Sequence, residues 1–336
     1  MDASVITNLI NWITRAIVFG TVVMYGALGE TLTEKSGNMN LGIPGIMCIG
    51  GAGGFIAAFS YEHAVVAPSA AFAIIIALAS SFLAAAAAGA LFCLLTTTLR
   101  ANQNVTGLAM TTFGVGAAKF FCMNSIPAGE TTIKAAFTNS VFTKKFPFAN
   151  SLGIPGQILF NYGFMMYLAI IFAVILSLFL HRTRAGLNLR AVGESPATAD
   201  AAGINVIRNK YLATVIGAGL AGLGGAYYVL DYNYGSWSTT AAGGIEALGW
   251  LSVALVIFAA WKPLNLIWGS YLFGLCYWLY NYITIFKIPM TTARCSLFES
   301  VPYIVTIIVL IVLSAKKNNK VRPPASLGLT YFREDR

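Results

Sequence analysis

Long apolar runs separated by short polar segments make up most of the chain. Four runs contain no Asp, Glu, Lys, Arg or His, and they cover residues 64–99, 146–180, 211–230 and 263–286. A membrane-spanning helix needs about 20 apolar residues, so each run is long enough to cross a bilayer. The whole pattern predicts about nine spans, within a range of about eight to ten, at residues 8–29, 43–61, 69–96, 105–123, 158–180, 211–230, 245–261, 264–286 and 300–314. The expected fold class is all-α, a polytopic bundle of transmembrane helices.

The composition agrees with this pattern. Of the 336 residues, 57% are hydrophobic and 10% are charged, whereas a soluble domain carries about 25% charged residues. A soluble fold of this length needs a largely polar surface, which this sequence lacks. The composition therefore excludes a soluble enzyme, a disordered protein and a nucleic-acid-binding module.

The basic residues are concentrated in two segments. The net charge is +9, and of the 21 Lys and Arg residues five lie in 182–210 and six in 316–336. Basic residues crowded between or after apolar spans are typical of cytoplasmic segments, so we expect both segments there rather than on nucleic acid. An even number of predicted spans separates the two, which is consistent with one side. The same count places the long loop 124–157 and the N-terminus outside.

The sequence contains no recognisable catalytic or metal-binding motif. Its five cysteines and two histidines are scattered, and it has no C-x-x-C pair, no Walker loop and no H-E-x-x-H. A G-x-G-x-x-G pattern at Gly217, Gly219 and Gly222 lies inside a predicted span. There, small residues favour close helix packing, whereas a dinucleotide fingerprint needs a preceding strand. We expect no enzyme activity and no bound cofactor.

An unusual polar stretch lies between the first two predicted spans, at residues 29–54. Asn38 and Asn40 stand between two apolar segments and are followed by glycines and Pro44. Gly/Pro-broken segments at membrane depth are tolerated only where protein or water satisfies the backbone, and they often line a transport path. The alternative is an ordinary cytoplasmic turn.

A second polar stretch, residues 100–106, stands at the entry to a predicted span. Asn102, Gln103 and Asn104 offer hydrogen-bond donors and acceptors that suit a neutral polar solute. The same residues suit the capping of a helix N-terminus, and local chemistry alone favours the cap.

The basic segment 181–210 contains the signals of a short helix. Ser195 suits the N-cap, Pro196 the first turn and Gly203 the exit, which predicts a helix over 196–202 of about 10 Å. Such a short helix buries little apolar surface alone. We therefore expect a docking partner, the alternative being a surface helix that lies on lipid headgroups.

Taken together and in their order, these segments resemble the membrane subunits of bacterial ATP-driven importers of the branched-chain amino acid, ribose and nucleoside type. The resemblance is strongest to the nucleoside and simple-sugar permeases. It covers most of the chain and rests on GETLTEKSGNMNLGIPGIM, ANQNVTGLAMT, GLNLRAVGESPATADAAGINV, AGLAGLGGA, GWLSVALVIFAAWKPL, LFESVPYIVTIIVL and PPASLGLTYFRE.

The resemblance implies a permease subunit of an ABC importer in a bacterial inner membrane. Such a subunit pairs with a second, in this case non-identical, permease, and the two move a small neutral solute by alternating access. The implied solute is a nucleoside or a simple sugar. ATPase subunits dock on the cytoplasmic side and use the ATP, and an extracytoplasmic substrate-binding lipoprotein docks outside.

The resemblance also assigns roles to residues of this chain. Residues 1–315 become a transmembrane permease domain with a coupling loop at about 182–210, and 316–336 a basic cytoplasmic tail. The implied ATPase-coupling residues are Glu194, Ser195, Pro196, Ala199, Asp200 and Gly203. The resemblance, together with the amide chemistry noted above, places the following residues beside the translocation path: Asn38, Asn40, Gln103, Asn104 and Thr106.

Two alternatives remain beside this interpretation. One is an ABC importer permease for flavin or another small solute, because some relatives in the same subgroup are associated with flavin uptake. The other is a stand-alone secondary transporter or channel, for which acidic residues at mid-membrane depth are expected. Asp231, Glu246 and Glu299 all fall near predicted span ends, which argues against the second alternative.

Overall fold

The computed structural model describes residues 3–126, 130–149, 151–282 and 322–332, together with nine positions between 297 and 311. The predicted span 300–314 therefore lies largely outside the described residues, as do Glu299 and most of the basic tail.

Eight long helices form the bundle, and their positions agree with the first eight predicted spans. They are α1 (Ala3–Glu34), α2 (Ile43–Ala64), α3 (Ala70–Cys93), α4 (Gln103–Met123), α7 (Phe164–Arg182), α10 (Val206–Tyr227), α11 (Ala241–Phe258) and α12 (Pro263–Tyr282). Two of them continue as π-helical turns, α3 into η1 (Leu94–Thr98) and α10 into η3 (Tyr228–Tyr232). Within the described residues, every long helix except α12 is long and apolar enough to cross a membrane, which makes seven. These findings confirm the all-α, polytopic membrane fold.

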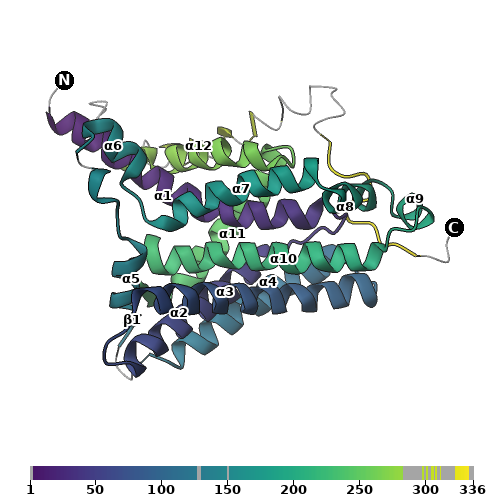
Figure 1. Ribbon diagram of the computed structural model, residues 1–336, viewed down its shortest axis with the longest axis horizontal. Helices are drawn as coiled ribbons and strands as arrows, with labels where there is room; N and C mark the ends of the chain where they lie inside the picture. Colours follow the sequence, from purple (N-terminus) through teal and green to yellow (C-terminus); the bar gives the residue numbers. More distant parts are fainter. Residues whose placement is uncertain are drawn as a thin grey trace.

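The long helices run side by side along the long axis of the molecule (Figure 1). The N-terminus, α5 (Ala136–Phe142), α6 (Gly153–Phe160) and strand β1 (Thr132–Lys134) lie at one end. The short helices α8 (Arg184–Glu194) and α9 (Pro196–Ala201) lie at the other end, close to the C-terminus. The described parts of the two basic segments thus share one end, as predicted, and the loop 124–157 lies opposite.

The loop 124–157 is more ordered than the hydropathy pattern predicts. Besides α5 and the start of α6 it contains the 3₁₀ turn η2 (Pro147–Ala149) and strand β1, which pairs antiparallel with β2 (Ser236–Ser238). Both Glu62 carboxylate oxygens accept hydrogen bonds from the first turn of α5, at Phe137 N (3.1 Å) and Thr138 N (3.2 Å). These contacts join residues far apart in the sequence, so local patterns do not reveal them.

Small residues let α10 pass close to its neighbours in the middle of the bundle. A side chain at Gly222 would meet Ala85 of α3 and Gly50 of α2, and one at Gly225 would meet the Met47 carbonyl. Close approach of this kind supplies the packing that holds helices together in lipid, where water exclusion contributes little. The glycine pattern of this span is therefore a packing device, as the sequence indicated.

Candidate functional site

Several buried polar side chains gather at the link between α1 and α2, at the α8–α9 end of the bundle. Helix α1 runs five residues beyond the predicted end of its span, so Glu30 and Glu34 lie one turn apart on it, and both are buried. The chain then turns at Gly37, whose φ of +87° favours glycine. Pro44 sits in the first turn of α2, where its missing N–H is no disadvantage. We call residues 35–42 the α1–α2 linker.

Asn38 connects the linker to two other helices. Its side chain is 1% exposed, and Nδ2 donates to Thr214 Oγ1 on α10 (3.1 Å) and to Thr97 Oγ1 in η1 (3.4 Å). Within the described residues the Asn38 Oδ1 atom has no hydrogen-bond partner. The amide nitrogen of this buried side chain is thus hydrogen-bonded and the amide oxygen is not. A rearrangement of the linker can give the oxygen a donor.

Asn40 connects the linker to the two buried glutamates of α1. Asn40 N donates to Glu30 Oε1 (3.1 Å), and Asn40 Oδ1 accepts from Gly42 N (3.0 Å). Trp261, in the turn between α11 and α12, donates from Nε1 to Glu34 Oε2. The sequence analysis assigned no role to Glu30 or Trp261, because nothing local shows that the α11–α12 turn returns to α1.

The start of α4 divides the predicted amide residues into two groups. Gln103 is 3% exposed and bridges the linker to the C-terminal segment, because Oε1 accepts from Met39 N (2.7 Å) and Nε2 donates to Leu329 O (3.4 Å). Asn102 caps α4 by accepting from Asn104 N (3.0 Å), which confirms the cap. Asn104 is exposed, whereas Thr106 is 8% exposed. The structure therefore brings Asn38, Asn40 and Gln103 together around the linker and leaves Asn104 on the surface.

The short helix predicted over 196–202 is present as α9, and its ends follow the expected signals. Ser195 Oγ accepts from Thr198 N (3.4 Å), Pro196 occupies the first turn, and Gly203 has a φ of +82°. One expectation needs correction. Ala199, expected at a partner contact, is 3% exposed and packs in a small cluster with Val192, Val206, Ile204 and Tyr331 of its own chain.

The outward face of α9 consists of other small residues. Ala197, Thr198 and Ala201 are exposed, as is Glu194 at the end of α8. Ala197 and Ala201 share the outward face because they lie four positions apart on the helix, whereas Ala199 packs against Val192 and Val206. A partner that docks on α9 meets Ala197, Thr198 and Ala201 first.

The C-terminal segment 322–332 fastens α8 and α9 to the linker. Ser326 donates to the Gly193 carbonyl twice, from N (3.0 Å) and from Oγ (2.5 Å), and Gly328 N donates to Gly37 O (3.2 Å). Tyr331 Oη donates to Asp200 Oδ2 of α9 (2.8 Å). We call this segment the tail strap. The sequence analysis identified the tail only as basic, and the one signal for the strap was its quoted PPASLGLTYFRE stretch.

The Glu194 carboxylate acts on the same junction. Burial lowers the pKa of the Lys35 ammonium on the linker, and the Glu194 carboxylate at the end of α8 opposes that shift. Glu194 Oε2 also accepts from Ala325 N of the tail strap (3.3 Å). The linker, α8 and the strap are therefore joined by hydrogen bonds.

The family model described as "Branched-chain amino acid transport system / permease component" matches residues 8–313. The chain belongs to this permease family. It is therefore a permease component of an ABC importer and a multi-pass inner-membrane protein. As in that family generally, a separate ATPase subunit hydrolyses the ATP, and a substrate-binding protein is a further partner. The family assignment excludes the alternative that the chain is a stand-alone secondary transporter or channel.

Three relatives of this permease illustrate the match. A putative glucose ABC transporter permease of Haloferax volcanii is 32% identical over 255 residues, which cover 76% of this chain and 72% of the relative. A nucleoside ABC transporter permease of Lactococcus lactis is 29% identical over 338 residues, covering 98% and 99%. A guanosine ABC transporter permease of Bacillus subtilis is 28% identical over 285 residues, covering 82% of each. No solved structure matches the chain.

The Trp261–Glu34 contact gives the first testable prediction. Trp261→Phe removes the hydrogen bond to a buried carboxylate and is expected to lower the free energy of unfolding by about 1–3 kcal/mol. Trp250→Phe is the matched control, because Trp250 is 37% exposed. Unfolding in mixed micelles, followed by circular dichroism, measures both variants. In the Trp261→Phe background, Glu34→Leu is expected to recover part of the loss. Equal stability of the two tryptophan variants would contradict the contact.

Proposed function

We propose that this permease carries a nucleoside, and that it does so by alternating access in a pair with a second, non-identical permease. The observation that carries the substrate class is the match to a nucleoside permease along 98% of the chain. The amide and hydroxyl side chains of the polar segments support a neutral solute, because such a solute needs no charged counterpart. A substrate-binding lipoprotein completes the complex at the outer face.

We further propose that the path for the solute passes the start of α4. Asn104 is an exposed amide there, and Thr106 lies one turn away from Gln103 on the same helix. In this proposal Asn38, Asn40 and Gln103 do not contact the solute in the conformation described here, since their side chains are buried and hydrogen-bonded within the protein. They shape the path by holding the linker, and a change of linker conformation is what brings them to the solute.

A simple sugar is the second candidate for the solute. It is favoured by the glucose permease of Haloferax volcanii, which is 32% identical over 76% of this chain. A flavin remains an alternative on the earlier resemblance alone.

Uptake into cells that carry the complete complex tests the solute. We expect labelled guanosine to accumulate, and excess unlabelled uridine or adenosine to compete with it, while excess glucose and riboflavin leave it unchanged. The same cells without this permease provide the background. Accumulation of labelled glucose without guanosine uptake would replace the nucleoside by a sugar, and accumulation of riboflavin alone would replace it by a flavin.

We propose that α9 is the element that receives the ATPase subunit. Its exposed face carries only the small side chains of Ala197, Thr198 and Ala201, which permit close approach to a concave partner. Asp200 and Ala199 face the strap and the rest of the chain, so they hold α9 in place instead of meeting the partner. Movement of the ATPase subunits then reaches the linker through α8 and the tail strap.

Substitutions at two alanines of α9 distinguish an effect on ATPase docking from an effect on folding. Ala197→Trp adds bulk to the exposed face, so the permease should insert and pair normally while ATPase retention falls at least about tenfold. Ala199→Trp adds bulk inside the small cluster and should lower the unfolding temperature of the permease itself. Copurification of the ATPase and thermal unfolding in detergent measure the two effects.

Ala136→Trp is the control, because Ala136 is exposed at the opposite end of the bundle. It should change neither ATPase retention nor unfolding temperature. Full ATPase retention and full transport in Ala197→Trp would show that α9 is not the docking element.

A further inference from the structure

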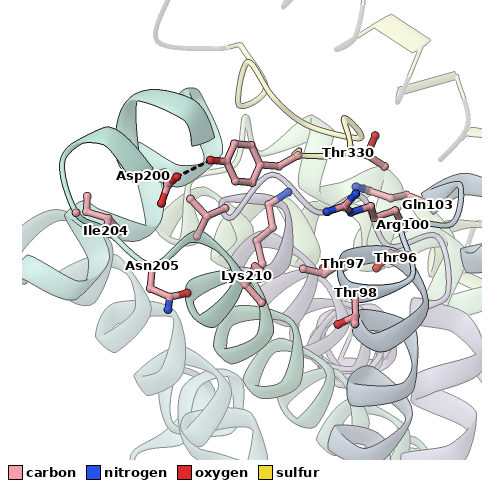
Figure 2. Close-up of a pocket in the computed structure, with 14 residues that line it drawn as sticks. Thr96, Thr97, Thr98, Arg100, Gln103, Asp200, Ile204, Asn205, Lys210 and Thr330 are labelled. Atoms are coloured by element: carbon pink, nitrogen blue, oxygen red, sulfur yellow. Dashed lines mark hydrogen bonds between the residues drawn. The ribbon is translucent and has the colours of Figure 1, made fainter. Parts of the chain in front are cut away.

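A polar cavity lies between α9, the start of α10, η1 and the tail strap. Its volume is about 390 Å³. Its wall carries threonine hydroxyls from η1 and from the strap, the amides of Gln103 and Asn205, and the cations Arg100 and Lys210 (Figure 2). The proposed path and the docking face of α9 leave this cavity without a role.

Lys210 is the unusual member of the lining. Its side chain rises from the second turn of α10 and is 3% exposed, and Figure 2 shows it extended into the space between the strap and η1. Within the described part of the chain, no hydrogen bond or ion pair holds its ammonium group. The ammonium nitrogen is not among the fully buried polar atoms without a partner and belongs to the cavity lining. A cation that has lost most of its hydration is stabilised by an anionic partner.

A second cation faces the same space. Arg100 adopts a φ of +60°, which is uncommon outside glycine, and its guanidinium lies 4.6 Å from the centre of the Phe332 ring. The one carboxylate in the lining, Asp200, accepts a hydrogen bond from Tyr331 Oη at the other side of the cavity (Figure 2). Val206 and Ile207, in the first turn of α10, also line the wall, and the first turn of a helix carries partial positive charge. Two cations and the first turn of α10 thus face one carboxylate, and the cavity carries a positive field.

We propose that this cavity binds an oxyanion of the phosphate class between Lys210 and Arg100. A tetrahedral oxyanion presents several acceptor oxygens, which suits two cations surrounded by hydroxyl and amide donors. The Lys210 side chain is 3% exposed, so a small anionic group reaches its ammonium more readily than the side chain of a docked protein. The anion is either inorganic phosphate or the phosphate of an acidic lipid headgroup. It ties η1 and α10 to the strap beside α9.

Thermal unfolding of the full-length chain, purified in detergent with its partner permease, tests the site. Sodium phosphate should raise the unfolding temperature above that in sodium chloride of equal ionic strength. Lys210→Met should weaken the apparent phosphate affinity about tenfold or more, because a charge-assisted hydrogen bond is lost. In chloride the same variant should unfold at an equal or higher temperature, since it removes an unpaired buried charge. This second readout distinguishes loss of the site from loss of the fold.

Arg208→Met is the matched control, because Arg208 is exposed at the same end of α10 and does not line the cavity. It should keep the full response to phosphate. Identical unfolding temperatures of the wild type in phosphate and in chloride, with no response to acidic lipid, would overturn the proposal. So would an undiminished response in Lys210→Met.

Lipid vesicles in phosphate-free buffer distinguish the two sources of the anion. If phosphatidylglycerol vesicles stabilise the wild type over Lys210→Met, and phosphatidylcholine vesicles do not, the headgroup is the ligand. A Lys210-dependent response to inorganic phosphate assigns the site to the free anion. A Lys210-dependent stabilisation that appears only when the ATPase subunit is added would overturn the proposal in favour of a carboxylate of that subunit.

Discussion

The position of α8 and α9 relative to the α1–α2 linker depends on the carbonyl group of Gly193. It accepts two hydrogen bonds from Ser326, while a side chain at Gly193 would meet the carbonyl of Lys35 on the α1–α2 linker. Gly328 completes the junction by donating to the carbonyl of Gly37. Hydrogen bonds to backbone carbonyls thus join distant parts of the sequence, and a buried carbonyl that loses its donor costs free energy.

This junction explains how a helix at the surface can act on the interior of the bundle. A displacement of α9 is transmitted to the linker through Gly193 and the strap. The linker carries Asn38, which is hydrogen-bonded to α10 and η1. Asn40 bonds the linker to Glu30 of α1, and Trp261 bonds the α11–α12 turn to Glu34 of the same helix. In the proposed cycle, ATPase closure therefore moves the linker and the helix ends around it as a unit.

Hydropathy and capping chemistry predict the local features of this fold well. The apolar runs place the first eight spans, and Ser195 and Gly203 mark both ends of α9, because these signals act between neighbouring residues. The inward direction of Ala199, the strap and the Trp261–Glu34 bond cannot be predicted in this way. Each depends on contacts between residues that are far apart in the sequence, and no local propensity encodes such contacts. The sequence marks the amides as candidates, and only the packing shows that Asn38, Asn40 and Gln103 are buried while Asn104 is not.

Deletion of residues 322–336 tests the central claim, that the tail strap joins α9 to the linker. The truncated permease should still insert, pair with its partner permease and bind the ATPase, because the exposed residues Ala197, Thr198 and Ala201 are not the ones that contact the strap. ATP hydrolysis should continue while solute uptake per ATP falls about tenfold, the size of a typical coupling between sites. The direct measurement is the ratio of uptake to ATP hydrolysis in proteoliposomes, with Ser326→Ala expected to give an intermediate ratio. An unchanged ratio in the truncated permease would contradict the account.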